Sequence, residues 1–115
     1  MPLDIQTREV NGVTLVELSG KIILGEESSA LREKIKDLIA TGKTRILLNL
    51  ARISFIDSAG VGTLVSAYTS ARSQGGEVKL SSLTKKFRET LQVTRLLTVF
   101  EVFDDDAACI ASFRK

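Results

Sequence analysis

The segment from residue 46 to residue 68 constrains the fold most, because its pattern predicts a buried strand that turns directly into a helix. Five mostly apolar residues at 46–50 are typical of a strand in the centre of a sheet. Apolar residues then recur at helical spacing, at Val61, Leu64, Val65 and Tyr68. Ser58 falls at the transition, where the helix dipole and unpaired N–H groups favour a negative charge. A phosphate on this hydroxyl would therefore be compatible with the fold.

The other segments predict an α/β fold in which strands and helices alternate. Strands are expected at 5–10, 13–18, 46–50, 77–80 and 99–103, and helices at 26–40, 58–73, 84–91 and from residue 104 onward. Asn11 and Gly12 favour a type I′ turn, and Gly20 is expected to close the second strand. Strands joined through helices should pair in parallel with right-handed crossovers. Without repeats or linkers, residues 1–115 are expected to form one domain.

Charge balance and residue types argue against several functional classes. Sixteen basic and 14 acidic residues leave a net charge of +2, which argues against a nucleic-acid partner held by charge. With no histidine and one cysteine, Cys109, the chain cannot build a Ser-His-Asp or Cys-His site, and a structural zinc site is improbable. No catalytic residue, metal or cofactor is therefore expected. Cys109 is interpreted as a small buried hydrophobe.

The N-terminal residues predict a cytoplasmic protein. They show no basic segment followed by an apolar stretch, so no signal peptide is expected. No apolar run approaches ~20 residues, so no membrane insertion is expected. A lone cysteine cannot form an internal disulfide, which suits a reducing compartment.

Two interpretations of Ser58 stay open from the residues alone. Either Asp57 or Ser58 serves as the N-cap of the helix, which is the more common role of such residues. Alternatively, Ser58 is phosphorylated, and a phosphate beside Asp57 would repel a docked partner. Gly60 and Gly62 suit both interpretations, because they permit tight internal packing or close approach of another molecule. An enzymatic role is disfavoured, since Gly60-Val61-Gly62 lacks the Gly-Lys-Ser/Thr ending of a P-loop.

One six-residue motif and several shorter ones carry a family resemblance. The motif is Asp57-Ser58-Ala59-Gly60-Val61-Gly62, preceded by Leu48-Asn49-Leu50 and residues 53–55. Matches extend over nearly the whole chain, through Asn11-Gly12, Leu18-Ser19-Gly20, Gly75-Gly76-Glu77 and residues 96–102. Together they resemble STAS domains of the anti-sigma factor antagonist family. The resemblance implies a mixed sheet of four or five strands with helices packed mainly on one face.

The resemblance also implies a function in which this chain is a ligand and a substrate, not an enzyme. In the family, the unphosphorylated antagonist binds an anti-sigma factor serine/threonine kinase and thereby frees the sigma factor. The kinase phosphorylates the residue that matches Ser58, binding is lost, and a phosphoserine phosphatase resets the system. The ATP belongs to the kinase, so this chain needs no cofactor of its own.

The expected partner-binding surface combines the motif with two neighbouring segments. It comprises Lys21, Ile22, Ile23, Leu24, Ser54, Phe55, Asp57, Ser58, Ala59, Gly60, Val61 and Gly62. Many antagonists carry an acidic residue after the second strand that helps to contact the kinase, whereas this chain has Ile22-Ile23 there. This apolar loop motivates an alternative function, a docking module in a stress-sensing or transport-associated assembly. Nucleotide binding is a third, lower-ranked hypothesis.

Overall fold

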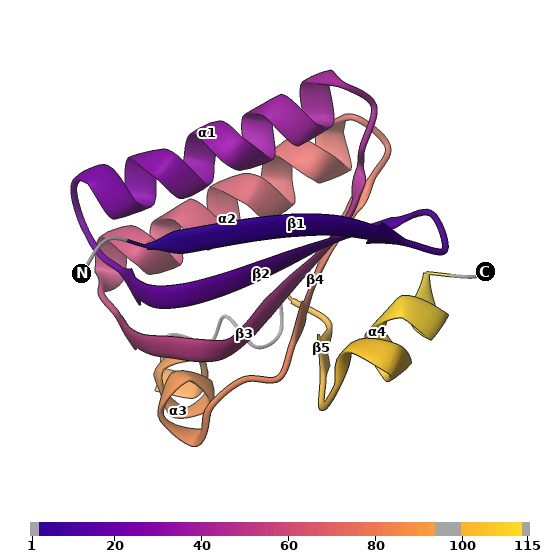
Figure 1. Cartoon of the computed structure of the whole chain (residues 1–115). Helices are drawn as coiled ribbons and strands as arrows, with labels where there is room; N and C mark the ends of the chain where they lie inside the picture. Colours follow the sequence, from indigo (N-terminus) through magenta and orange to yellow (C-terminus); the bar gives the residue numbers. More distant parts are fainter. Residues whose placement is uncertain (1–2, 94–99, 114–115) are drawn as a thin grey trace.

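The computed structural model describes residues 3–93 and 100–113, and their strands and helices alternate after an N-terminal hairpin (Figure 1). In chain order the elements are β1 (Asp4–Val10), β2 (Val13–Ile22), α1 (Glu26–Ala40), β3 (Arg45–Ile56), α2 (Ser58–Ser73), β4 (Glu77–Ser81), α3 (Lys85–Val93), β5 (Val102–Phe103) and α4 (Asp106–Ser112). The predicted bounds of α1 and α2 are confirmed. The α/β class is confirmed with them.

The strands form one mixed sheet in the order β1-β2-β3-β4-β5. β1 is antiparallel to β2, and every following pair is parallel. The turn between β1 and β2 has positive φ at both central residues, 53° at Asn11 and 82° at Gly12, as a type I′ turn requires. The predicted hairpin and the parallel pairing are therefore confirmed.

Two helices cover one face of the sheet and enclose the main core. From β2 to β4 the strand order advances in one direction, so right-handed crossovers place α1 and α2 on the same face. Figure 1 shows these helices side by side over that face. Aliphatic side chains fill the space between, among them Val16, Leu18, Leu31, Ile35, Leu48 and Leu64. The prediction of helices mainly on one face is confirmed.

The short helix α4 packs on the opposite face, over a smaller apolar cluster of Val13, Leu15, Leu47, Cys109 and Phe113. Polar contacts fix its first turn, where Asp106 accepts hydrogen bonds from Asn49 Nδ2 (2.8 Å) and Ser81 Oγ (2.6 Å). Cys109 is fully buried, so its interpretation as a core residue is confirmed.

Two predicted strand ends are wrong. β2 continues past Gly20 to Ile22, and β3 continues past Leu50 to Ile56. The register shifts between these strands at Glu17/Ser19 and Gly20/Lys21, so additional residues of β3 are accommodated while pairing continues. A strand end depends on the neighbouring strand, and that neighbour is not visible in local sequence. Of the strand predicted at 99–103, residue 99 lies outside the described residues, and β5 comprises only Val102–Phe103.

The extended strands bring two segments to the same edge of the sheet. Because β2 and β3 are parallel, with Ile22 opposite Ile56, their carboxyl ends lie side by side. The loop from β2 to α1 therefore lies beside the start of α2. Asp57 N–H donates to the carbonyl of Ile22 at 3.2 Å and continues the pairing beyond the strand. This edge is where ligands of parallel α/β sheets usually bind.

Candidate functional site: the start of helix α2

Asp57 organises this edge of the sheet through both of its carboxylate oxygens. Oδ1 accepts a hydrogen bond from Gly60 N at 2.8 Å, so Asp57, not Ser58, is the N-cap of α2. Oδ2 accepts a hydrogen bond from Leu24 N at 3.0 Å. One side chain thus holds both the helix start and the neighbouring loop. The pKa of Asp57 is lowered because its ionised form accepts these two hydrogen bonds. The bond from Leu24 has the larger effect and the bond from Gly60 the smaller one.

A second set of bonds fixes the loop from the side of α1. The carbonyl of Ile23 accepts hydrogen bonds from Ser28 Oγ at 2.7 Å and from Ser28 N at 3.1 Å. Ser28 is buried, so these bonds are protected from competition with water. The backbone of the loop is therefore held from both sides, and this defines where the Leu24 side chain leaves the loop.

Ser58 is the first residue of α2, and its side chain is exposed. Since Asp57 supplies the cap, the Ser58 hydroxyl is not needed for this purpose. Within residues 3–93 and 100–113 it has no hydrogen-bond partner. A kinase can reach such a hydroxyl without unfolding any element. The first-turn N–H groups and the helix dipole would stabilise the resulting phosphate.

The two glycines of the motif have different roles. A Cβ on Gly60 would lie 2.1 Å from the carbonyl oxygen of Ile22 and 2.7 Å from Ile56 Cγ1. Gly60 thus allows α2 to lie directly against the end of β2. A Cβ on Gly62 would meet no atom within 4 Å, and this residue is exposed. Only Gly62 presents bare backbone to an approaching molecule.

The apolar loop after β2 divides between the core and the surface. Ile22 is fully buried and Ile23 is half-buried, whereas the Leu24 side chain is 77% exposed. Phe55 near the end of β3 is 45% exposed. These two are the only large hydrophobic side chains exposed in the described part of the chain, and both flank the Asp57–Ser58 pair. Such grouping of exposed apolar groups is typical of a protein contact site.

The structure brings most of the residues in the predicted surface to this edge, but not all of them face outward. Lys21, Leu24, Ser54, Phe55, Ser58 and Gly62 are exposed, and Ile23, Asp57 and Ala59 are half-buried. Ile22, Gly60 and Val61 are buried and support the surface from below. Ser54 also serves the fold, since its hydroxyl donates to the Gly20 carbonyl at 3.1 Å.

Comparison with known proteins identifies the architecture around this site. The sequence model of the STAS domain family matches residues 4–108 of this chain. This chain belongs to the STAS domain family. The Asp57–Gly62 motif, on which the sequence resemblance was based, lies within the matched residues and forms the start of α2.

Curated relatives of this STAS domain align over almost their full length. It is 25% identical over 107 residues to the anti-sigma F factor antagonist of Paenibacillus polymyxa, covering 92% of this chain and 91% of the relative. It is 24% identical over 102 residues to the anti-sigma-B factor antagonist of Bacillus subtilis, covering 89% and 92%.

Solved structures show the same fold. An anti-sigma factor antagonist from Mycobacterium paratuberculosis superposes with a TM-score of 0.85 at 18% identity, covering 98% of this chain and 95% of that one. The Bacillus cell fate determinant SpoIIAA in its phosphorylated form superposes with a TM-score of 0.75 at 23% identity, covering 96% and 99%.

Among the residues that the structure describes, none of the helices combines the length and apolar character needed to cross a membrane. In the same residues, no group of three or more His, Cys, Asp or Glu side chains is placed to hold a metal ion.

Sequence reasoning missed one contributor to this surface. Lys86, near the start of α3, is not among the residues of the predicted surface, yet its Nζ lies 5.8 Å from the centroid of the Phe55 ring. Phe55 and Lys86 also line a small notch of about 50 Å³ between the end of β3 and α3. The two residues are far apart in sequence, so no local signal could have paired them.

Proposed function

We propose that this STAS domain is an anti-sigma factor antagonist whose binding to an anti-sigma factor serine/threonine kinase is abolished by phosphorylation of Ser58. The observation that carries the proposal is the position of the Ser58 hydroxyl. It is exposed, unneeded for capping, and flanked by the exposed side chains of Leu24 and Phe55. Relatives named as antagonists of anti-sigma factors support the class of partner.

The geometry supports a switch that needs no change of fold. A partner that buries Leu24 and Phe55 must also cover Ser58, because these residues occupy the same edge of the sheet. A phosphate would add about −1.5 to −2 charges next to Asp57, which is itself ionised. Steric bulk, repulsion and desolvation would then oppose docking together. A loss of about 3 kcal/mol would weaken binding more than a hundredfold.

In this mechanism the chain is not an enzyme. The kinase supplies ATP, transfers the γ-phosphoryl group to Ser58 Oγ and keeps ADP, and a phosphoserine phosphatase later hydrolyses the ester. This chain competes with the sigma factor for the kinase, so it acts where the sigma factor acts, in the cytoplasm. Support for a phosphorylated state comes from SpoIIAA, a protein of the same fold whose structure is known in phosphorylated form.

The test is intact-mass and peptide mass spectrometry after incubation with ATP and each candidate anti-sigma factor kinase of the source organism. We expect one added phosphate that maps to Ser58 and is absent in Ser58→Ala. Ser66→Ala is the matched control, because Ser66 is another exposed serine on α2. Ser58→Asp should lose binding to the same kinase. Phosphate on another residue, or full binding by Ser58→Asp, would contradict the proposal.

Leu24 also favours a second candidate, a docking module within a larger assembly. An apolar side chain exposed to 77% on a rigid loop suits a permanent interface as well as a transient one. Size-exclusion chromatography with light scattering distinguishes the candidates. A one-to-one complex with a kinase that dissociates after phosphorylation supports the switch, whereas a phosphate-insensitive multimer supports the docking module.

A further inference from the structure

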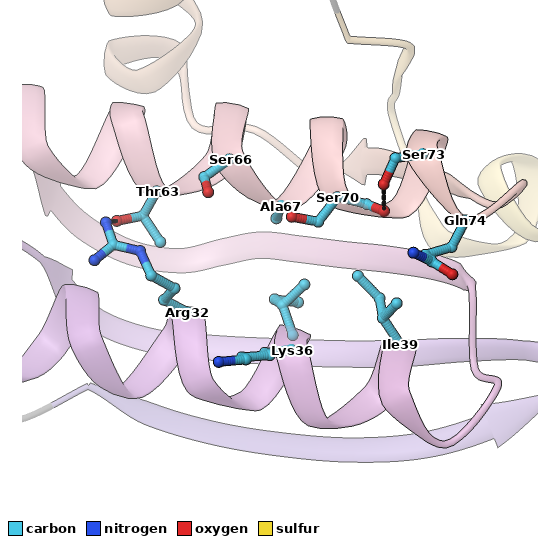
Figure 2. A pocket seen from close by; sticks show the side chains of 10 residues that line it. Arg32, Lys36, Ile39, Thr63, Ser66, Ala67, Ser70, Ser73 and Gln74 are labelled. Carbon is cyan, nitrogen blue, oxygen red and sulfur yellow. Dashed lines mark hydrogen bonds between the residues drawn. The ribbon is translucent and has the colours of Figure 1, made fainter.

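A groove runs between α1 and α2 (Figure 2), and none of the residues that line it belongs to the predicted partner-binding surface around Leu24 and Phe55. Its volume is about 310 Å³, at the lower end of the range for small-molecule sites. Ten residues line it: Arg32, Ile35, Lys36 and Ile39 from α1, Thr63, Ser66, Ala67, Ser70 and Ser73 from α2, and Gln74, the C-cap of α2.

The two helices contribute different chemistry to this groove. The buried side chains of Ile35 and Ala67 form its floor, and Ile39 is half-buried beside them. The α2 wall carries short hydroxyl and amide side chains that leave the floor accessible. On the α1 wall stand two cations, Arg32 and Lys36, which are four residues apart and so lie on one side of the helix. The groove therefore joins an apolar floor to a positive rim.

The charges of the rim are not balanced from within the protein. None of the ten lining residues is acidic, and neither Arg32 nor Lys36 forms an ion pair in the described ranges. Arg32 reaches across the groove in Figure 2, where its Nη2 donates to Thr63 Oγ1 at 3.3 Å. A guanidinium has five N–H donors, so donors are left for an anion. A carboxylate matches that planar set of donors.

We propose that this groove binds an amphiphilic monoanion, a carboxylate carried on a short unbranched apolar chain. The carboxylate pairs with Arg32 and Lys36, and the chain lies over Ile39 and Ala67. Two cations can neutralise the single charge of a carboxylate, but they cannot balance the several charges of a polyphosphate. A neutral apolar molecule would bury the floor but leave both cations unused. The proposal concerns a different surface from the Ser58 site and does not depend on it.

The carboxylate site is connected to the first turn of α2. Thr63 Oγ1, which accepts from Arg32, donates to the carbonyl of Ala59 at 3.0 Å. An anion that draws Arg32 toward itself changes this short chain of hydrogen bonds. Amide signals around Ala59 and Thr63 should therefore respond together with those of the groove.

The test is a titration of ¹⁵N-labelled protein with sodium octanoate, followed by ¹H–¹⁵N correlation spectra. We expect saturable shifts at the amides of Arg32, Lys36, Ser66, Ser70 and Ser73, and none at those of Leu24 and Phe55. Hexanoate should bind about fourfold more weakly, since an open groove buries roughly half of each added methylene. Octanol, which has the same chain without the charge, should not saturate the same amides.

Variants separate recognition of the anion from general apolar binding. The double variant Arg32→Gln/Lys36→Gln should bind octanoate about tenfold more weakly, because both exposed charge pairs are lost. Lys34→Gln, on the same helix but outside the groove, is the matched control. Arg32 and Lys36 are exposed and Lys34 is half-buried, and a glutamine can retain the aliphatic part of each side chain, so the melting temperature of each variant should stay close to that of the wild type.

Four results would overturn the proposal: absence of saturable shifts, shifts centred on Leu24 and Phe55, equal binding of octanol, or unchanged affinity in the double variant. Shifts of the groove amides that depend on protein concentration without octanoate would assign the groove to a second copy of the chain. Shifts caused by a kinase but not by octanoate would assign it to a protein partner. Each of these assignments would also overturn the proposal.

Discussion

The carboxylate of Asp57 accepts a hydrogen bond from the backbone N–H of Leu24, 33 positions earlier in the chain, at 3.0 Å. The same carboxylate caps α2 through Gly60 N at 2.8 Å. Among the described residues, Leu24 has the most exposed large hydrophobic side chain. The bond fixes its backbone relative to Asp57, the residue before the proposed phosphorylation site. Asp57 thus positions the contact surface in addition to capping a helix.

Replacing Asp57 should separate these two roles. Asp57→Ala removes both acceptor oxygens and should lower the melting temperature by several degrees, because a helix cap and a loop tether are lost together. Asp57→Asn retains one acceptor oxygen and should lie between Asp57→Ala and the wild type. Differential scanning fluorimetry measures the order of the three. Hydrogen exchange at the Leu24 amide should accelerate in Asp57→Ala, and an unchanged exchange rate would contradict the tether.

The lowered pKa of Asp57 predicts a pH dependence of stability. Since the folded-state pKa lies below the ordinary value of 3.8, ionised Asp57 stabilises the folded state at all pH values above 3.8. This contribution is lost as the pH falls from that value through the folded pKa. The difference in melting temperature between wild type and Asp57→Asn should therefore be constant near neutral pH and shrink in acid. A difference that grows in acid would show that the assigned direction of the shift is wrong.

The two glycines of the motif provide a matched pair of substitutions. Gly60→Ala should destabilise the fold by about 2 kcal/mol or more, because the new methyl group meets the carbonyl of Ile22 at 2.1 Å. Gly62→Ala should stabilise it by about 0.5–1 kcal/mol, since alanine favours a helix and has open space there. Urea denaturation of both variants measures the difference. Equal effects would contradict the distinction between a packed and an open glycine.

Leu24 and Phe55 should contribute to partner binding more than to stability. Leu24→Ser removes a largely exposed group and should change the free energy of unfolding by about 0.5 kcal/mol or less, whereas Phe55→Ser also removes the buried part of the ring and should cost about 1 kcal/mol. Each should weaken the complex with the kinase that phosphorylates Ser58 by at least tenfold, as expected for a buried apolar anchor. Isothermal titration calorimetry provides the measurement, with Thr69→Ala on the exposed face of α2 as control. Unchanged affinity in both variants would place the interface elsewhere.

Cys109 should be inert in the folded protein. Burial raises the pKa of its thiol to about 12, so almost no thiolate exists at pH 8. A chromogenic disulfide reagent should therefore react slowly with native protein and rapidly after addition of guanidinium chloride. Because Cys109 lies on the buried face of α4, the slow native rate reports how often this helix opens. Rapid reaction of the native protein would show that α4 is not stably docked.

Features set by neighbouring residues could be predicted from the sequence. The bounds of α1 and α2 follow from apolar residues at helical spacing and from glycines beyond the helix ends, such as Gly42 with φ of 86°. The Asn11-Gly12 turn follows from the tolerance of these residues for positive φ. The exposed Ser58 hydroxyl follows from its place between a buried strand and an amphipathic helix. In each case the cause lies within a few residues of the effect.

Only the tertiary structure decided how the contact surface is built. The ends of β2 and β3 depend on one another, because each strand continues for as long as its partner supplies hydrogen bonds. Burial of Ile22 and exposure of Leu24 depend on where α2 packs, and the same packing distinguishes Gly60 from Gly62. The bond from Leu24 to Asp57 and the approach of Lys86 to Phe55 join positions far apart in sequence. Such contacts arise when the sheet brings distant segments to one edge, and no local pattern encodes them.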